Sequence, residues 1–193
     1  MGNLRSVQKA FERVGAKALV TQDPSIIKRS EKVVLPGVGA MKPAIEKLNA
    51  NGMTQAINEA ISAGKPFLGI CLGLQLLFEE SSEGGSVKGL GIIKGSVERF
   101  KSLKVPHMGW NQLQIKNTKC PLFKNIADQS HVYFCHSYFV KPKNAQAAST
   151  ITDYGVEFTS SVWQNNVFGV QFHPEKSQDT GLTILKNFVE LKI

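Results

Sequence analysis

The sequence predicts an α/β fold in which a mostly parallel sheet is flanked by helices, with additional antiparallel strands in the second half. Two observations predict it. In the first half, short apolar runs alternate with segments of helical periodicity, which is typical of a parallel sheet covered on both faces. In the second half, strand-like runs follow one another with turn residues between several of them. Because 193 residues contain no linker or repeat, we expect a single domain over residues 1–193.

The first half supplies the alternating elements. Residues 4–14 carry apolar side chains at helical spacing and predict a helix that closes near Gly15. Residues 18–20, 32–35 and 66–71 are short apolar runs and predict strands. Helical patterns follow at residues 44–48, 53–63 and 72–80.

The second half predicts mainly strands. They are expected at residues 96–100, 112–115, 132–140, 147–152, 156–163 and 167–172. Asn165 and Asn166, between the last two runs, predict a hairpin turn. Residues 179–191 have apolar side chains on one side and predict a closing helix.

The composition excludes several classes of protein. No stretch is apolar for the roughly 18 residues that a membrane helix needs, so we expect no membrane association. Residues 1–5 contain no signal-peptide core. The three cysteines, Cys71, Cys120 and Cys135, have no Cys-x-x-Cys spacing, which favours a reducing, cytoplasmic location. We expect Cys120 and Cys135 to be structural.

The net charge of +8 raises the hypothesis of a nucleic-acid-binding module. Lysines cluster at residues 101–104 and 116–119. However, no zinc finger, helix-turn-helix or RNA-binding aromatic signature accompanies them. A solvated basic face is therefore favoured, and no nucleic-acid partner is expected.

The sharpest local feature is Gly69-Ile70-Cys71-Leu72-Gly73, between a predicted buried strand and a helix. Such a pentapeptide makes a tight strand-to-helix turn whose glycines leave room around an exposed nucleophile. The helix N-terminus would favour a thiolate. The alternative is a buried core cysteine packed beside glycines; the context favours the nucleophile.

A thiolate nucleophile needs a group that moves protons, usually a histidine. His173 follows an apolar strand, and Glu175 stands two residues later, where it could orient the imidazole. A surface turn is the alternative for His-Pro-Glu taken alone. Metal binding is not expected, because no His-x-x-x-His or Cys-x-x-Cys spacing is present.

A third segment follows the predicted strand at residues 32–35. Gly37 and Gly39 flank Val38, and two glycines there can turn backbone N–H groups outward. The segment is either a simple turn or half of an oxyanion hole, in which the other donor would be the N–H of Leu72.

Together these segments resemble the triad-type (class I) glutamine amidotransferases. The order matches: the oxyanion loop, then Gly69-x-Cys71-x-Gly73-x-Gln75, then His173-x-Glu175. Further segments, at residues 72–81 with Glu83, 87–90, 107–111 and 133–138, are similar to the glutaminase subunits of imidazole glycerol phosphate synthase. The similarity runs over essentially the whole chain.

The resemblance implies a class I glutamine amidotransferase-like (flavodoxin-like) fold and a role for each matching residue. It implies that Cys71 is the nucleophile, His173 the general base and acid, and Glu175 its orienting partner. The implied oxyanion-hole residues are Gly37, Val38, Gly39 and Leu72. The implied glutamine-binding residues are Gln75, Glu83, His136, Ser137 and Tyr138. The implied partner-interface residues are Asn3, Trp110, Tyr133 and Lys176, for which core or surface roles are the alternatives.

The resemblance also implies an activity. Glutamine would be hydrolysed to glutamate and ammonia without a metal or organic cofactor. The ammonia would pass to a cyclase subunit with a (β/α)₈ barrel fold, in a heterodimer that forms imidazole glycerol phosphate and aminoimidazole carboxamide ribonucleotide in histidine biosynthesis. The alternatives are a paralogous glutaminase that feeds ammonia to a surface-polysaccharide sugar amidotransferase, and a scaffold without activity.

The start of the chain departs from the family pattern. Related chains begin with an apolar strand that ends in Asp-Tyr-Gly just before the Met-Gly-Asn-Leu-Arg segment, whereas here Met1 stands inside that loop. We therefore expect that the first strand is missing and that the chain start is truncated or wrongly assigned.

Overall fold

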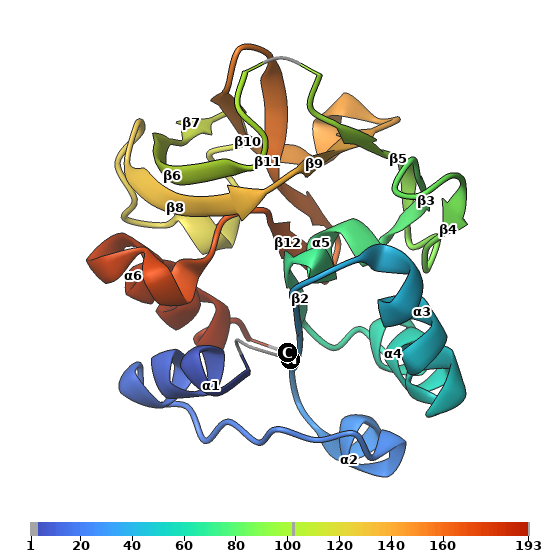
Figure 1. The fold of residues 1–193 in the computed structure, drawn as a ribbon. Coiled ribbons are helices and arrows are strands. Elements are labelled where there is room, and N and C mark those ends of the chain that lie inside the picture. The colour runs from blue at the N-terminus through green and yellow to red at the C-terminus, as the bar shows by residue number, and fades with distance from the viewer. Residues whose placement is uncertain (1–3, 102, 193) are drawn as a thin grey trace.

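The fold consists of a long mixed sheet with helices on both faces of one half and a smaller strand layer beside the other half (Figure 1). The structure is a computed structural model that describes residues 4–101 and 103–192. Its α-helices are α1 (Leu4–Arg13), α2 (Pro24–Arg29), α3 (Met41–Ala50), α4 (Met53–Ser62), α5 (Leu72–Leu76) and α6 (Gln178–Val189). Three short 3₁₀ helices in the described residues are η1 (Pro121–Phe123), η2 (Ala145–Ala147) and η3 (Pro174–Lys176).

The strands of the large sheet run in the order β1-β2-β12-β11-β9-β5-β3-β4. Their bounds are β1 (Val33–Gly37), β2 (Phe67–Cys71), β3 (Phe78–Ser81), β4 (Val87–Lys88), β5 (Ile93–Arg99), β9 (Tyr138–Pro142), β11 (Glu157–Gln164) and β12 (Val167–Val170). Branching from this path, β10 (Ala148–Asp153) pairs with β11 and with β7 (Gln114–Ile115). A separate two-stranded sheet joins β6 (His107–Gln112) to β8 (His131–His136).

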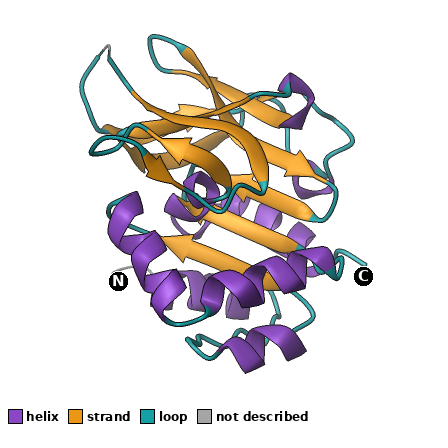
Figure 2. Cartoon of the chain, turned by 90° about the vertical axis from the view of Figure 1, so that its right-hand side faces the viewer, coloured by secondary structure: helices purple, strands orange, loops and turns teal. Residues whose placement is uncertain are grey.

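Alternation along β2 and β12 divides the core between two faces of the sheet, because successive side chains of a strand point to opposite sides. Leu68, Ile70 and Val170 pack with α1 and α6 on one face. Phe67 and Val167 pack with α4 and α5 on the other. Figure 2 shows these strands between helices. The predicted α/β class is therefore confirmed: β1, β2 and β12 pair in parallel and are covered on both faces.

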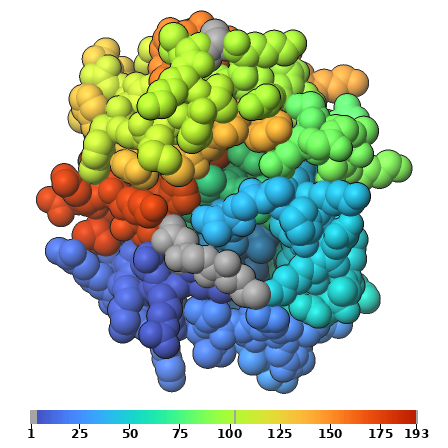
Figure 3. Space-filling model, in the orientation of Figure 1, coloured from blue at the N-terminus to red at the C-terminus, as the bar shows by residue number. Residues whose placement is uncertain are grey.

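The second half adds antiparallel strands, as predicted. β11 pairs antiparallel with β9, β10 and β12, and β5 pairs antiparallel with β9. The turn at Asn165 and Asn166 joins β11 to β12, with Gln164 opposite Val167, which confirms the predicted hairpin. In the space-filling view, residues between about 103 and 120 cover much of the top of the molecule, and α6, α1, α2 and α3 surround its lower half (Figure 3).

The structure corrects four expected elements. Residues 18–20 are not a strand, and Leu19 and Val20 are exposed, because no described strand lies beside them to complete a hydrogen-bonded ladder. The helix expected at 72–80 ends at Leu76, and β3 begins at Phe78 to pair with β5. The strands expected at 112–115 and 132–140 are each divided in two, near Leu113 and at Ser137.

Candidate active site

Cys71 lies at the turn between β2 and α5, and this turn depends on two glycines. The cysteine has φ 54° and ψ −108°, in a region that non-glycine residues rarely adopt. A Cβ on Gly73 would collide with the carbonyl oxygen of Leu35, and one on Gly69 would lie 2.6 Å from the carbonyl oxygen of Gly73. The close approach of α5 to the sheet therefore requires glycine at both positions, and it holds the cysteine in its strained conformation.

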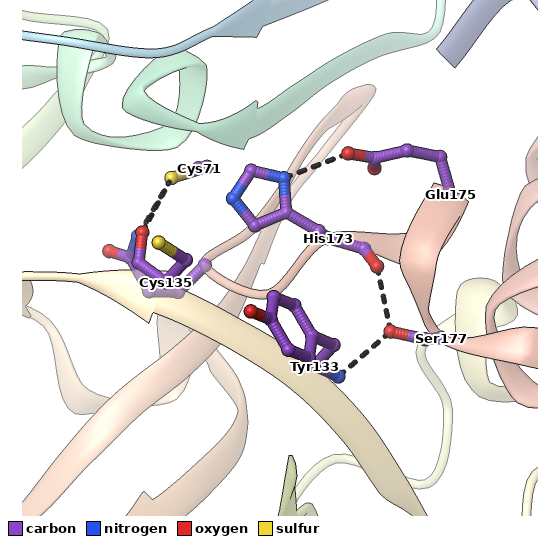
Figure 4. A network of polar contacts seen from close by, with 7 residues as sticks. Cys71, Tyr133, Cys135, His173, Glu175 and Ser177 are labelled. Atoms are coloured by element: carbon purple, nitrogen blue, oxygen red, sulfur yellow. Dashed lines mark hydrogen bonds and ion pairs between the residues drawn. The ribbon is translucent and has the colours of Figure 1, made fainter. Parts of the chain in front are cut away.

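His173 and Glu175 meet beside this turn (Figure 4). Nδ1 of His173 lies 2.8 Å from Oε1 of Glu175, and the two side chains are only 4% and 0% exposed. Burial lowers the pKa of His173, but hydrogen bonds and charge interactions with Cys71 and Glu175 outweigh burial and raise the pKa to about 9. The imidazole is therefore charged at neutral pH. The structure brings together the three residues predicted from the sequence.

The backbone around His173 is hydrogen-bonded to strand β8. Its N–H donates to the carbonyl oxygen of Tyr133 at 2.9 Å. The Ser177 hydroxyl donates to the carbonyl oxygen of His173 at 2.7 Å and accepts from the N–H of Tyr133 at 2.9 Å (Figure 4). These bonds fix the loop that carries both His173 and Glu175.

The predicted oxyanion segment lies next to the cysteine. β1 and β2 run parallel with Gly37 opposite Cys71, so the loop after β1 begins beside the sulfur-bearing turn. Gly39 has φ 95°, which glycine alone adopts without strain, and Val38 is 44% exposed. A Cβ on Gly37 would lie 3.0 Å from Cβ of Leu72. Gly37 and Leu72 therefore lie side by side, and Val38 and Gly39 continue the loop from there.

Two of the residues expected to bind glutamine are already engaged within the protein. Nε2 of Gln75 donates to the carbonyl oxygen of Tyr138 at 3.0 Å and to Oε1 of Gln171 at 3.1 Å. The Glu83 carboxylate accepts the N–H of Met41 at 2.7 Å, at the start of α3. An anionic group is favoured there, because the N–H groups of the first helical turn have no partner within the helix.

Two further histidines, His107 and His136, lie in the aromatic core next to the site. Nδ1 of His107 is 3.0 Å from Nε2 of His136, whose Nδ1 is 2.8 Å from the carbonyl oxygen of Tyr138. Burial lowers the pKa of His107 to about 4 and that of His136 to about 3. Both nitrogens of His136 are occupied, so its ring has no nitrogen left for a substrate.

The comparisons with known proteins identify the family. The model described as glutamine amidotransferase class-I matches residues 2–191. The chain belongs to this family. Its curated relatives include proteins named imidazole glycerol phosphate synthase subunit HisH. The relative from Syntrophotalea carbinolica is 51% identical, over 99% of this chain and 96% of the relative. The one from Geobacter sulfurreducens is 50% identical, over 100% and 95%.

Solved structures agree on the fold. A protein described as a glutamine amidotransferase superposes with a TM-score of 0.76 at 18% identity, over 97% of this chain and 95% of the other. The glutaminase domain of CTPS from Trypanosoma brucei superposes with a TM-score of 0.65 at 14% identity, over 100% and 90%. The mixed sheet flanked by helices is therefore the class-I amidotransferase fold.

The predicted interface residues of this amidotransferase gather on the outer face of the β6–β8 sheet. Trp110 stands opposite Tyr133 in the register, with ring centroids 6.1 Å apart, and Nζ of Lys176 lies 5.5 Å from the Tyr133 ring centroid. Trp110 is 47% exposed, which excludes the alternative of a core aromatic. Asn3, the fourth predicted residue, lies outside the described residues.

Two residues of the amidotransferase site, Gln171 and Ser177, were not predicted from the sequence. Gln171 is fully buried, and its Nε2 lies 3.7 Å from the Cys71 sulfur. Its position two residues before His173 was the available signal, because alternate residues of an extended segment point to one side. No comparable signal marks Ser177, whose role depends on contacts with Tyr133 across the fold.

Metal sites and membrane spans are both absent from the part of the chain that the structure describes. No three His, Cys, Asp or Glu side chains within residues 4–101 and 103–192 come together as a metal site requires. In the same ranges, no helix has the length and apolar character needed to span a bilayer.

Proposed function

We propose that this chain is the glutaminase subunit of an imidazole glycerol phosphate synthase, working as one domain in the cytoplasm. It hydrolyses glutamine and passes the ammonia to a barrel-shaped cyclase subunit. The observation that carries the proposal is the buried Cys71–His173–Glu175 arrangement at a strand-to-helix turn. Family membership and the relatives named as synthase subunits support it.

In the first half-reaction, the Cys71 thiolate attacks the side-chain carbonyl carbon of glutamine. The oxyanion that forms is stabilised by backbone N–H groups of the segment at Gly37–Gly39 and of Leu72. The His173 imidazolium then donates its proton to the departing nitrogen. The C–N bond breaks, ammonia leaves, and a glutamyl thioester remains on the sulfur. A histidine that is protonated at rest, with its pKa raised to about 9, suits this step.

In the second half-reaction, neutral His173 removes a proton from a water molecule, and the resulting hydroxide attacks the thioester carbonyl. The C–S bond breaks, glutamate leaves, and the thiolate–imidazolium pair is restored. Glu175 accepts the hydrogen bond from Nδ1 throughout and keeps the other ring nitrogen, Nε2, toward the reacting atoms. We assign binding of the substrate's main-chain groups to the surroundings of Gln75, Glu83 and the segment 136–138.

The ammonia enters the partner rather than the solvent. In the cyclase, it reacts with phosphoribulosyl-formimino-aminoimidazole carboxamide ribonucleotide to yield imidazole glycerol phosphate and the aminoimidazole carboxamide ribonucleotide. The face of β6 and β8 that carries Trp110 and Tyr133, with Lys176 of η3 over the Tyr133 ring, suits a partner surface. Met108 extends it, with 61% of its area exposed, and a hollow of about 370 Å³ lies beside Trp110 and Ser177. Exposed aromatic and Met side chains are enriched in protein–protein interfaces.

The proposal is tested with the purified chain, the candidate cyclase and the cyclase's nucleotide substrate. We expect glutamine-dependent synthase activity from the pair, and complementation of a histidine auxotroph that lacks this subunit. The Cys71→Ala variant should lose glutamine-dependent turnover but leave ammonium-dependent synthesis by the cyclase intact. Residual glutamine-dependent turnover in that variant would contradict the mechanism. Failure of complementation with the cognate cyclase present would contradict the pathway and favour the sugar-amidation paralogue.

Trp110→Ala tests the interface separately. Loss of a half-exposed aromatic anchor should weaken binding of the cyclase by about tenfold to a hundredfold. Phe123→Leu, a conservative change in the core, is the control, and it should leave the dissociation constant unchanged.

A further inference from the structure

Gln171 connects the substrate side of the site to the reacting sulfur. It comes directly after β12, and its side chain is fully buried. Its Oε1 lies 3.1 Å from Nε2 of Gln75, and its own Nε2 lies 3.7 Å from Sγ of Cys71. The two contacts use both ends of the Gln171 amide, so its orientation decides whether the sulfur faces a donor or an acceptor.

The orientation follows from Tyr138. A backbone carbonyl can only accept, so the Gln75 atom that lies 3.0 Å from the Tyr138 oxygen is the amide nitrogen. The same nitrogen carries the second hydrogen, which points to Gln171. Gln171 must therefore present its oxygen to Gln75, and its NH₂ group faces Cys71.

A chain of neutral side chains keeps this arrangement from rotating. The Tyr138 oxygen also accepts from Nδ1 of His136, so Nε2 of His136 accepts from Nδ1 of His107. Nε2 of His107 then faces the amide nitrogen of Asn111 at 3.3 Å. From Asn111 to His136 every donor points toward the Tyr138 oxygen, which also accepts from Gln75, so both lone pairs of that oxygen are used.

The sulfur's other neighbours explain what such a donor does. The carbonyl oxygen of Cys135, 3.9 Å from Sγ, can accept from a thiol but repels a thiolate. His173 stands on the other side of the sulfur, backed by Glu175 and with the neutral His136 near it. The sulfur is a thiolate before it attacks the substrate and again when the C–S bond of the thioester breaks, and at both points the amide of Gln171 offers it a donor that does not depend on the protonation of His173.

We propose that Gln171 is a further catalytic residue, whose Nε2 donates to the Cys71 sulfur, stabilises its thiolate and directs it toward the substrate carbonyl, with Gln75 as the positioning residue that orients the amide. The catalytic role of Gln171 rests on the proposed function. Its effect on the ionisation of the Cys71 thiol does not depend on that function.

The test compares Gln171→Met with Gln171→Glu. Methionine keeps the length of the side chain and removes the donor, whereas glutamate keeps the contact from Gln75 and turns an acceptor toward the sulfur. Iodoacetamide labelling of Cys71, followed by peptide mapping, reports the thiolate directly. We expect labelling at pH 7 to slow by about tenfold to a hundredfold in Gln171→Met and by more in Gln171→Glu, with the pH profile moved to higher pH. With glutamine, kcat should fall in parallel while KM stays within about twofold.

Gln164→Glu is the matched control, because it adds the same charge at an exposed position near the opposite end of the sheet strands. It should label and turn over like the wild type. If Gln171→Glu does not fold, Gln171→Met decides alone. Wild-type labelling profiles in the folded variants would overturn the inference. If the labelling profile of the Gln171 variants is shifted but the wild-type protein does not hydrolyse glutamine, the inference is supported and the proposed function is contradicted.

Discussion

The buried histidines of this molecule differ in charge at neutral pH: His173 is charged, whereas His107 and His136 are neutral. His173 is 3% exposed and has its pKa raised to about 9. His107 and His136 are 3% and 5% exposed and have theirs lowered to about 4 and about 3. Burial is similar, so burial does not explain the difference. His173 faces a sulfur and a carboxylate, whereas the other two face each other, a carbonyl oxygen, an amide and aromatic rings.

The charge of the neighbouring groups therefore decides whether a buried imidazole is protonated. Among dipoles, the neutral ring both donates and accepts, so the pair serves as a rigid hydrogen-bonded support. Beside two acidic groups, desolvation is outweighed and the ring holds a proton ready for transfer. The same residue type thus gives a support next to the site and a proton carrier within it.

The largest effect on turnover is expected when the carboxylate of Glu175 beside the charged His173 is replaced. Glu175→Gln keeps the shape of the side chain but removes its negative charge and lets an NH₂ donor face Nδ1, which favours the wrong tautomer of His173, so kcat for glutamine should fall by about 10³-fold to 10⁴-fold. The pKa of His173 should move down toward that of an ordinary histidine, which ring NMR titration would follow. Near-normal turnover in this variant would show that the carboxylate is dispensable.

A smaller effect is expected in the pH dependence of stability, where the two groups act in opposite windows. His173 has a raised folded pKa, so its stabilisation is complete below about pH 6.5 and is lost as the pH rises through about 9. His107 and His136 have lowered pKa values, so their contribution is present above about pH 6.5 and is lost as the pH falls toward about 4 for His107 and about 3 for His136. The free energy of unfolding, measured with denaturant from pH 4 to pH 9.5, should be largest at about pH 6.5, where the two windows meet.

The alkaline side of that profile can be assigned with Glu175→Gln, in which the loss of stability between pH 6.5 and 9 should shrink. An unchanged alkaline limb would mean that another group titrates there.

The smallest effect is expected for His107→Phe. Phenylalanine retains the stacking against Phe134 and Tyr154, at ring centroid distances of 4.7 and 4.0 Å in the present structure. It leaves Nε2 of His136 without its donor, so the free energy of unfolding at pH 7 should fall by about 1–2 kcal/mol. The acid limb of the stability profile should also become shallower, because one fewer buried neutral histidine must take up a proton. An unaltered acid limb would contradict the assignment.

The sequence predicted the parts of the site that are local. The Gly69–Gly73 turn and the His173–Glu175 pair each lie within five consecutive residues, so spacing alone indicated their chemistry, and the resemblance supplied their order. The network through Gln171 joins residues 96 and 100 positions apart, and nothing short of the fold brings them together. The strand predicted at residues 18–20 was also wrong. A strand forms only beside a neighbouring strand, and a local pattern does not show whether one is there.

Affinity labelling shows whether Cys71 attacks glutamine within this triad. A chloroketone analogue of glutamine carries an electrophilic carbon at the position of the reacting amide. We expect one label per chain at Cys71, slowed by glutamine and lost in Cys71→Ala. Labelling of Cys120 or Cys135 instead, or labelling of Cys71 that glutamine does not slow, would contradict it.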